Sequence, residues 1–498
     1  MGTMNGNTNI VLFITDNHAR ALLGAAGHPT VKTPNLDRIA KNGVSFTNAY
    51  CASPLCCPSR AAIATGRYPH QTGYWDNSLA YDGKTPTWHH RVREQGHSVA
   101  SIGKLHYRSG RNDNGFSEEI LPLHILNETG AVIALLRATP KGMPQRAGHG
   151  KIYDKSGIGE ADYQTYDRQI TEAAIQWLEE NGRKTGKPWV LMVSYASPHP
   201  PFSVPHDIWD MYPLDDVPMP VQWRKSDQPD HPALKYLNWM NMFEDEFDED
   251  LIRRVVAGYC GLITVTDAQI GKVVTKLEQM DLMDSTRIIY TSDHGEAAGH
   301  HGIMGKSNHY EHSIGVPLMM QGPGIEPGTN IEDVVSLVDL FPTIVEGVGA
   351  ELAEADADLP GQSLWPLMAG GNSTSAGQAF TEFHAMGSVN ASFALRKSDH
   401  KLIYHVGMPS QLFDLSNDPL EEHDLLSGGG SHPEADALEA ELRMLVDPET
   451  TDQRAKADQK ARIEELGGVD AVSKAGIFSA SPIPGKSVEM EDVATPNG

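Results

Sequence analysis

The sequence predicts an α/β protein with a large, mostly parallel sheet flanked by helices and a small C-terminal antiparallel sheet with a helix. The first observation is a series of short, nearly continuous apolar runs, which are typical of central strands covered on both faces. The second is that helical stretches separate these runs, as expected where helices cover both faces of a parallel sheet. The third is a change near residue 375 to short strands with turns between them.

The predicted strands of the large sheet share one feature: each stops abruptly, and an ionisable residue follows. These apolar runs are residues 9–15, 98–102, 189–195 and 287–292. The polar residues at or just beyond their ends are Asp16, Asn17, His18, Lys104, His106, His199, Asp293 and His294. Because ligands bind at the carboxyl edge of open α/β sheets, we expect the functional site at this edge.

Helices are expected between the strands. Thr33-Pro34 begins a helix over residues 35–41, since proline suits the first turn, and Gly43 ends it. Residues 44–50 form another strand candidate, which leads into a loop with two cysteines. Longer helical stretches span residues 172–180 and 251–282.

Changes in composition and in the pattern of predicted elements divide the chain into three regions. Residues 1–374 form the large α/β domain that carries the site, residues 375–447 a smaller α+β subdomain, and residues 448–498 a tail. The subdomain is expected to hold strands at residues 380–383, 392–396, 401–404 and 411–415 and a helix at 433–445.

The tail has little apolar surface to bury by itself. After Pro448 we expect a short polar helix, and from residue 477 a segment rich in Pro, Ser and Gly. Either this segment is disordered or it lies across a neighbouring subunit. The tail therefore suggests a homo-oligomer.

Composition excludes several classes of protein. A net charge of −25 argues against a nucleic-acid partner, and it means that an anionic ligand needs a locally positive pocket. No apolar run approaches membrane-spanning length and no signal peptide is visible, so we expect no membrane partner and a cytoplasmic location. Four cysteines in 498 residues do not make a disulfide framework.

Two adjacent cysteines, Cys56 and Cys57, precede a helix expected at residues 59–65. Pro58-Ser59-Arg60 follows them, and then an apolar turn that supplies packing residues. A helix N-terminus favours an anion, because its free backbone N–H groups and its dipole point toward the ligand. Taken alone, the stretch fits either such a site or a buried loop with ordinary thiols.

A second group of residues is suited to a divalent cation. Asp16, Asp293 and His294 offer carboxylate and imidazole donors, and Asn17 adds a candidate amide oxygen. Carboxylate oxygens favour Ca²⁺ or Mg²⁺, whereas an imidazole shifts the preference slightly toward Mn²⁺ or Zn²⁺. A lone Asp after a strand is usually a turn former or helix cap, so the prediction depends on several such ends converging.

The cysteine stretch resembles the signature of the type I sulfatases, in the alkaline phosphatase superfamily. In that family the first cysteine of Cys-x-Pro-x-Arg is oxidised after synthesis to formylglycine, an aldehyde. Cys56 fits this motif with Pro58 and Arg60, and Thr65-Gly66 follows as in the family. Cys57 does not fit, because Ser59 stands where the proline should be.

Other motifs resemble the same family in the same order. They are Gly103-Lys104-Leu105-His106, Ser197-Pro198-His199-Pro200-Pro201, His301-Gly302-Ile303-Met304-Gly305-Lys306 and Asp414-Leu415-Ser416-Asn417-Asp418-Pro419. The resemblance thus reaches to about residue 425, and it implies an alkaline-phosphatase-like fold, a formylglycine-generating enzyme as partner and a small sulfate ester as substrate.

The resemblance also implies roles for individual residues. One divalent cation, most simply Ca²⁺ with Mn²⁺ or Mg²⁺ as alternatives, is held by Asp16, Asn17, residue 56, Asp293 and His294. Asn17 departs from the second Asp that is common in the family. The residues implied to hold or offset the charge of the sulfate are Arg60, Lys104 and Lys306, with His199 and Asn77 as further substrate contacts.

The implied mechanism is covalent. One hydroxyl of the hydrated formylglycine attacks sulfur, and His199 or Lys306 protonates or stabilises the leaving alcohol oxygen. His106 then takes the proton of the second hydroxyl, so that sulfate leaves and the aldehyde returns. A serine could not complete this cycle, because it has no second hydroxyl on the same carbon.

The sequence favours hydrolysis of aryl or small alkyl sulfates, with phosphonate monoesters and phosphodiesters as side substrates. In a phosphonate monoester hydrolase of the same superfamily we expect Tyr and Thr in place of Lys104 and His106. A choline sulfatase would need an aromatic cage, for which Trp75, Trp88 and Tyr107 are the candidates.

Two alternative hypotheses assign the chain to other functional classes of protein. The first is a binding protein that keeps the fold and has lost turnover, and only Asn17 points that way. The second is a metal-dependent phosphatase or phosphodiesterase that uses an unmodified residue, against which Cys56 argues.

Overall fold

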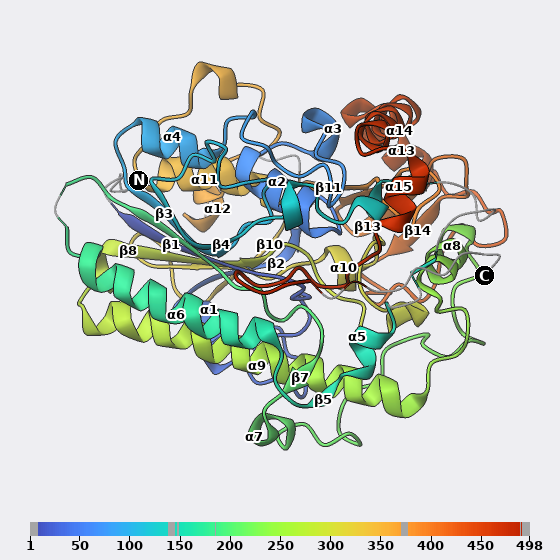
Figure 1. The fold of residues 1–498 in the computed structure, drawn as a ribbon, viewed down its shortest axis with the longest axis horizontal. Helices are drawn as coiled ribbons and strands as arrows, with labels where there is room; N and C mark the ends of the chain where they lie inside the picture. The colour runs from blue at the N-terminus through green and yellow to red at the C-terminus, as the bar shows by residue number, and fades with distance from the viewer. Residues whose placement is uncertain are drawn as a thin grey trace.

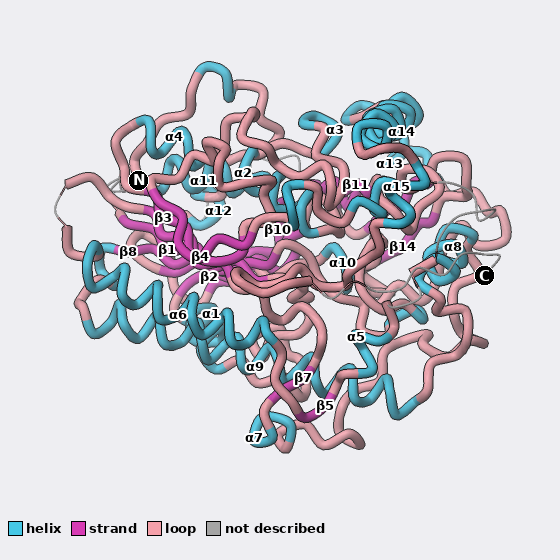
Figure 2. Tube along the Cα trace, in the orientation of Figure 1, coloured by secondary structure: helices cyan, strands magenta, loops and turns pink. Residues whose placement is uncertain are grey.

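The computed structural model describes residues 8–137, 145–146, 149–184, 186–369, 377–488 and 490. The strands of its large sheet are β1 (Asn9–Thr15), β2 (Gly43–Tyr50), β3 (Val99–Lys104), β4 (Glu118–Leu123), β6 (Val190–Ser194), β8 (Thr286–Ser292), β9 (Leu318–Gln321) and β10 (Thr329–Ser336). They form one eight-stranded sheet in the order β10-β2-β9-β8-β1-β6-β3-β4. Figure 2 shows these strands as a twisted central band with helices on either side.

Helices cover both faces of this sheet. One layer contains α1 (Pro34–Lys41), α6 (Asp162–Asn181) and α9 (Glu249–Gln279), and the other contains α2 (Cys56–Thr65), α4 (Trp88–Glu94), α11 (Leu340–Gly347) and α12 (Trp365–Met368). In Figure 1 the first layer lies below the sheet and the second above it. The predicted α/β class with a mostly parallel sheet is confirmed.

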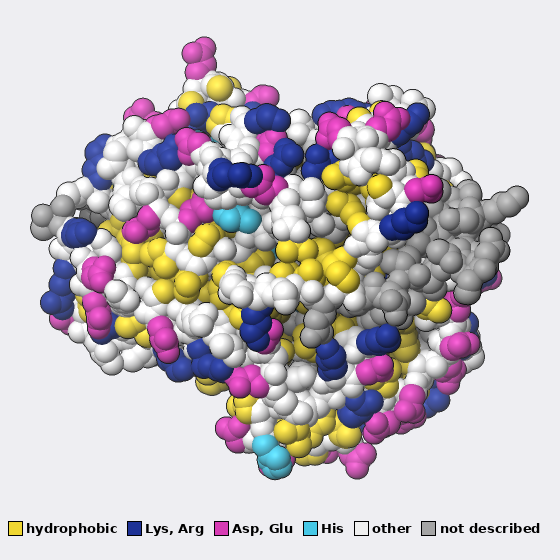
Figure 3. All heavy atoms as spheres, in the orientation of Figure 1, with side chains coloured by type: hydrophobic (Ala, Val, Ile, Leu, Met, Phe, Trp, Pro, Cys, Tyr) yellow, Lys and Arg dark blue, Asp and Glu magenta, His cyan; other side chains and the backbone are white. Residues whose placement is uncertain are grey.

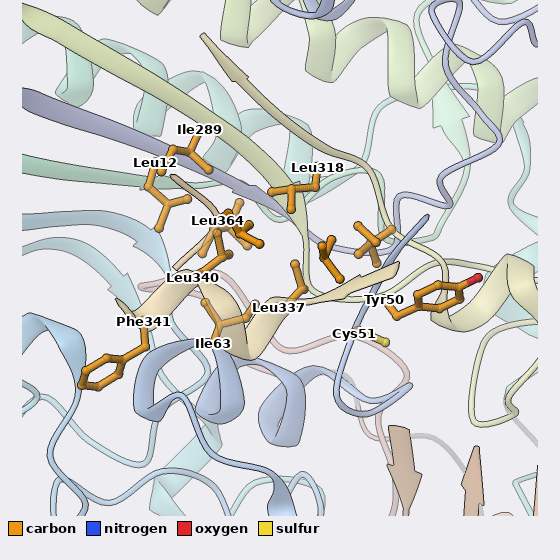
Figure 4. Packing of buried hydrophobic residues seen from close by; sticks show 14 of the residues in the cluster. Leu12, Tyr50, Cys51, Ile63, Ile289, Leu318, Leu337, Leu340, Phe341 and Leu364 are labelled. Atoms are coloured by element: carbon orange, nitrogen blue, oxygen red, sulfur yellow. The ribbon is translucent and has the colours of Figure 1, made fainter. Parts of the chain in front are cut away.

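Strand β1 shows why its sequence is a continuous apolar run. Ile10, Leu12 and Ile14 pack in the core on the side of α2 and α11, whereas Val11 and Phe13 pack against α1, α6 and α9. Successive side chains of a strand point to opposite faces, and here both faces are buried. Figure 4 shows Leu12 beside Ile289 of β8, and Ile63 of α2 below Leu337 and Leu340.

Strand direction brings the polar strand ends together. Strand β1 pairs in parallel with β6 and β8, and β3 pairs in parallel with β6. Strand β9 is antiparallel to both β8 and β2, so β2 runs in the same direction as β8. The carboxyl ends of β1, β2, β3, β6 and β8 therefore meet at one edge of the sheet.

The C-terminal sheet contains β11 (Gln378–Phe383), β12 (Ser392–Lys397), β13 (His400–His405) and β14 (Gln411–Asp414), all antiparallel. Helix α13 (Pro433–Leu445) packs on it through Leu438 and Leu442, as the sequence predicts. Glu382 N donates to Ala52 O (3.0 Å), which joins this sheet to the loop before α2. The predicted boundary at residue 374 lies outside the described residues, and the division into domains stays a prediction.

The remaining elements are connections and terminal helices. The short helices and strands are α3 (Pro69–Thr72), η1 (Leu126–Glu128), η2 (Val132–Leu135), α5 (Lys151–Asp154), β5 (Gly157–Ile158), β7 (Ser203–Val204), α7 (His206–Trp209), η3 (Met283–Ser285), η4 (His300–Gly302), α10 (Glu311–Ile314), η5 (Leu337–Asp339) and η6 (Glu354–Asp356). The longer ones are α8 (Pro232–Asn241), α14 (Pro448–Glu465) and α15 (Val469–Lys474). None of the described helices combines the length and the apolarity needed to cross a bilayer.

The described part of the tail is more ordered than its composition suggests. Helix α14 spans 18 residues, so the polar helix after Pro448 is not short. Residues 477–488 pack on their own chain, where Ile477 and Ile483 are buried, and contact of this segment with a neighbouring subunit stays a prediction. In Figure 1 this dark red segment crosses the middle of the molecule.

Candidate active site

Helix α2 begins at Cys56, three residues earlier than its predicted start. Leu55 is extended and precedes the helix, and Gly66 ends it in the left-handed region (φ 64°), which glycine adopts without strain. Every residue of the helix is buried. Ser59 Oγ donates to the backbone carbonyl of Asp293 (2.5 Å), so the start of α2 is fixed against the end of β8.

Four predicted residues converge beside this helix. One donor atom from each of Asp16, Cys56, Asp293 and His294 lies within 4.8 Å of the others, and all four residues are buried. His294 Nε2 lies 3.2 Å from Cys56 Sγ. The same nitrogen is 3.9 Å from Asp16 Oδ1 and 3.7 Å from Asp293 Oδ1. Among the described residues this is the one group of His, Cys, Asp and Glu with metal-ligand spacing.

The tautomer of His294 suits a cation at this group. Its Nδ1 lies 3.0 Å from the carbonyl oxygen of Gly295, which only accepts, so Nδ1 carries the proton and Nε2 presents its lone pair to the other donors. Burial raises the pKa of Asp16, but the charges of Lys104 and Lys306 outweigh it and hold that pKa well below its usual value. An ionised carboxylate and a free imidazole nitrogen therefore fit a divalent cation.

Asn17 lies next to this group, but its side-chain amide makes hydrogen bonds to other residues. Its Oδ1 accepts from Lys306 Nζ (2.9 Å), and its Nδ2 donates to Glu296 Oε2 (2.7 Å). Asn17 as a metal ligand stays a prediction.

Sequence reasoning missed Glu296, which is buried and also accepts from Gly305 N (2.6 Å). It thereby holds the loop that carries Lys306. The signal was present, since Glu296 follows Asp293-His294 in the same motif.

The Arg60 side chain is bonded within the site, to the buried carboxylate of Asp293. Its Nε donates to Asp293 Oδ2 (2.7 Å), and its Nη1 donates to Lys104 O (2.7 Å) and Ser194 Oγ (2.9 Å). Lys104 Nζ lies 2.5 Å from Asp16 Oδ2, and both side chains are inaccessible to solvent. Two cations thus offset the two buried carboxylates. Direct contact of Arg60 or Lys104 with a sulfate stays a prediction.

A cavity of about 110 Å³ opens beside Cys56. The predicted residues that line it are Cys56, Asn77, His106, His199 and Lys306. Asn77 Oδ1 also accepts from Cys57 N (3.1 Å), so Asn77 both lines the cavity and caps the start of α2. The cavity brings together residues that are more than 200 positions apart in the chain.

Cys56 itself is protonated in this environment. Burial and the charge of Asp16 raise the pKa of its thiol to about 12, although Lys306 opposes them. A thiol is a weak nucleophile compared with a thiolate. The geometry therefore favours a site whose nucleophile is not the unmodified cysteine.

The three candidates for an aromatic cage do not lie at the cavity. Trp75, Trp88 and Tyr107 are buried, and none of them lines the cavity. Trp75 Nε1 donates to Asp458 Oδ2 (2.8 Å), and Tyr107 stacks on Phe116. These side chains are used for packing and cannot enclose a quaternary ammonium group.

Comparison with known proteins assigns the chain to a family. The family model described as "Sulfatase" matches residues 8–350. The chain belongs to the sulfatase family. A second model, described as the C-terminal part of N-sulphoglucosamine sulphohydrolase, matches residues 299–447. Membership makes this chain a sulfuric ester hydrolase, and it confirms the resemblance drawn from the motifs.

The relatives cover most of the chain. Arylsulfatase K of Canis lupus familiaris is 31% identical over 474 residues, which are 89% of this chain and 83% of the relative. Choline-sulfatase of Rhizobium meliloti is 30% identical over 428 residues, 84% of this chain and 82% of the relative. Among solved structures, phosphonate monoester hydrolase of Agrobacterium radiobacter has a TM-score of 0.70 at 24% identity, with 91% of this chain and 96% of that chain covered. This last likeness shows the fold alone.

Proposed function

We propose that the chain hydrolyses aryl or small alkyl sulfate esters with a formylglycine formed from Cys56 and one divalent cation. The convergence of Cys56 with Asp16, Asp293 and His294 carries this proposal. Cys56 is also the residue that stands at the first position of Cys-x-Pro-x-Arg. The metal would be held by the two carboxylates, by His294 Nε2 and by the oxygen that replaces Cys56 Sγ.

Formylglycine supplies two hydroxyls on one carbon once it is hydrated, and the cation offsets negative charge. The chain's own residues orient and stabilise the ester. Lys104 and Lys306 supply fixed positive charge at the carboxyl edge of the sheet, where a sulfate needs it. Lys306 borders the cavity, whereas Lys104 pairs with Asp16 and is not among the residues that line it.

Lys306 is the better donor to the leaving oxygen. His199 Nδ1 lies 2.8 Å from the carbonyl oxygen of Pro200 and must donate to it. Burial, with Lys306 and Lys104, lowers the pKa of His199 well below its usual value, so the ring is neutral and Nε2 presents a lone pair. The ammonium group of Lys306 has three N–H donors and lines the same cavity.

The size and lining of the cavity support a small ester. Its apolar walls include Ile125, Ile133 and Met304, which suit an aryl or short alkyl group. Phosphonate monoesters and phosphodiesters are proposed as side substrates, because the same positive site accepts any tetrahedral oxyanion. Lys104 and His106 stand where we expect Tyr and Thr in a dedicated phosphonate monoester hydrolase.

The decisive measurement is the mass of the tryptic peptide with Cys56 and Cys57, from a host that contains the formylglycine-generating enzyme. We expect loss of sulfur at Cys56 only. An intact thiol at Cys56 in protein that still turns over sulfate esters would contradict the proposed nucleophile.

Removal of the cation is expected to lower both the melting temperature and the activity. Ca²⁺ is the first choice, with Mn²⁺ or Mg²⁺ as alternatives, and a bound ion at 100 times its Kd stabilises the folded state by about 2.7 kcal/mol. Thermal unfolding after dialysis against a chelator, and after addition of each ion, measures this. Asp16→Asn serves as control and should lose the ion-dependent shift. A melting temperature that no ion changes in the unsubstituted protein would refute the site.

The homo-oligomer also stays a prediction. Its sequence argument has weakened, since residues 477–488 pack on their own chain. The formylglycine-generating enzyme remains the one protein partner that the proposed chemistry requires.

A further inference from the structure

The C-terminal strap, residues 476–487, follows α15 and borders the cavity. Ile477, Phe478, Ser479 and Ser481 line the same cavity as Cys56 and Lys306. Figure 1 shows the strap crossing the molecule between the two helical layers, and Figure 3 shows hydrophobic side chains across the same part of this face. The strap is therefore a wall of the site, although more than 400 residues separate it from Cys56.

The strap is attached to the first turn of α6. Tyr163 Oη donates to the carbonyl oxygen of Ser481 (2.8 Å), and Lys486 Nζ pairs with Asp162 Oδ1 (2.6 Å). Ile477 and Ile483 are buried on either side of Ser481. The buried side chains on either side, and the hydrogen bond from Tyr163 Oη to the Ser481 carbonyl between them, fix the position of Ser481.

Ser481 contacts His106, the residue to which the family resemblance gives the final step. Ser481 Oγ lies 3.0 Å from His106 Nε2. The other ring nitrogen, Nδ1, is buried and has no hydrogen-bond partner among the described residues. His106 also has a φ of 53°, a conformation unusual for residues other than glycine, and its N–H donates to Leu123 O (2.8 Å). Backbone and strap together hold the ring.

We propose that the strap is a working part of the active site and that Ser481 is a positioning residue for His106. His106 Nε2–H donates to Ser481 Oγ, and this leaves the lone pair on Nδ1 for proton transfer. The inference rests on the proposed function for the step it serves. In that step Nδ1 accepts the proton of a hydroxyl on residue 56. The electron pair of that O–H bond forms the aldehyde C=O, and sulfate leaves with the electrons of the broken C–O bond.

The protonation state of the His106 ring supports this assignment. Burial, with the charges of Lys104 and Arg60, lowers the pKa of His106 well below its usual value, so the ring is neutral and has one proton to place. A hydroxyl that accepts at Nε2 decides which nitrogen carries it. Loss of such a partner leaves both tautomers populated and the ring free to turn.

The test compares Ser481→Ala with Ser487→Ala, an exposed serine of the same strap. We expect Ser481→Ala to lower kcat by about 10- to 100-fold with little change in KM. The leaving alcohol should then appear as a burst of one equivalent per enzyme, since the final step has become slow. Ser481→Thr keeps the hydroxyl and should restore most of kcat, whereas Ser487→Ala should match the unsubstituted enzyme.

A second readout does not need turnover. In full-length protein with ¹⁵N-labelled histidine, the His106 signals, assigned by their loss in His106→Gln, report which nitrogen is protonated. We expect Nε2–H in the unsubstituted protein and a mixture of tautomers in Ser481→Ala. An unchanged tautomer, or equal kinetics for the two alanine variants, would overturn the inference. A tautomer change in protein without sulfatase activity would instead refute the proposed function and leave the positioning role standing.

Discussion

Replacing Cys56 with serine is expected to abolish steady turnover of sulfate esters, with a loss of at least about 1,000-fold in kcat. Serine keeps an oxygen at the position of Cys56 Sγ, between Asp16 and His294. It lacks the second hydroxyl from which His106 would take a proton, so at most one ester per enzyme can react. Release of the alcohol under single-turnover and steady-state conditions measures both parts.

Cys57→Ser is the matched control, because it makes the same atomic change one residue away. Cys57 is also buried in α2, but it packs against Ala80 and Ile125. Its substitution should cost some stability and leave kcat within a few-fold of the unsubstituted enzyme. Equal losses in both variants would mean that the helix, rather than the residue at position 56, carries the effect. Full turnover by Cys56→Ser would exclude a formylglycine mechanism.

The fold was predictable where burial on both faces produces a continuous apolar run. Strands β1, β6 and β8 are of this kind, and the sequence places them within a residue or two. The carboxyl-edge rule then predicts that Asp16, Asp293 and His294 meet, because parallel strands end at one edge. Cys56 could be added only because its motif is specific in sequence, since its loop reaches the site from β2.

The features that were missed depend on partners far away in the chain. Helix α14 has few apolar residues, and its burial of Gln459 and Asp452 rests on polar contacts that no periodic pattern reveals. The strap has a composition typical of disorder, and contacts with distant residues such as His106 and Tyr163 hold it in place. Trp75 looked available for a cage because a sequence does not show that Asp458 binds its indole.

Substitution of Arg60 by glutamine is expected to lower the free energy of unfolding by about 3–5 kcal/mol. Arg60 is 4% exposed and donates to Asp293 through Nε. Without the guanidinium, the buried carboxylates of Asp293 and Asp16 lose one of the cations that offset them. Arg38→Gln is the control: Arg38 pairs with Glu278 at 2.8 Å, but both side chains are about 40% exposed, and we expect less than about 1 kcal/mol.

Urea unfolding of both variants, with and without Ca²⁺, separates structure from metal binding. If the carboxylates hold a cation, Ca²⁺ should recover part of the stability lost in Arg60→Gln, because the ion restores positive charge beside Asp16 and Asp293. Ca²⁺ should not change the free energy of unfolding that Arg38→Gln loses. Equal costs for the two substitutions would show that Arg60 does not support the carboxylates. Arg60→Gln could instead lose the expected free energy of unfolding with no recovery on addition of Ca²⁺. Arg60 would then stabilise the fold through its bonds to Lys104 O and Ser194.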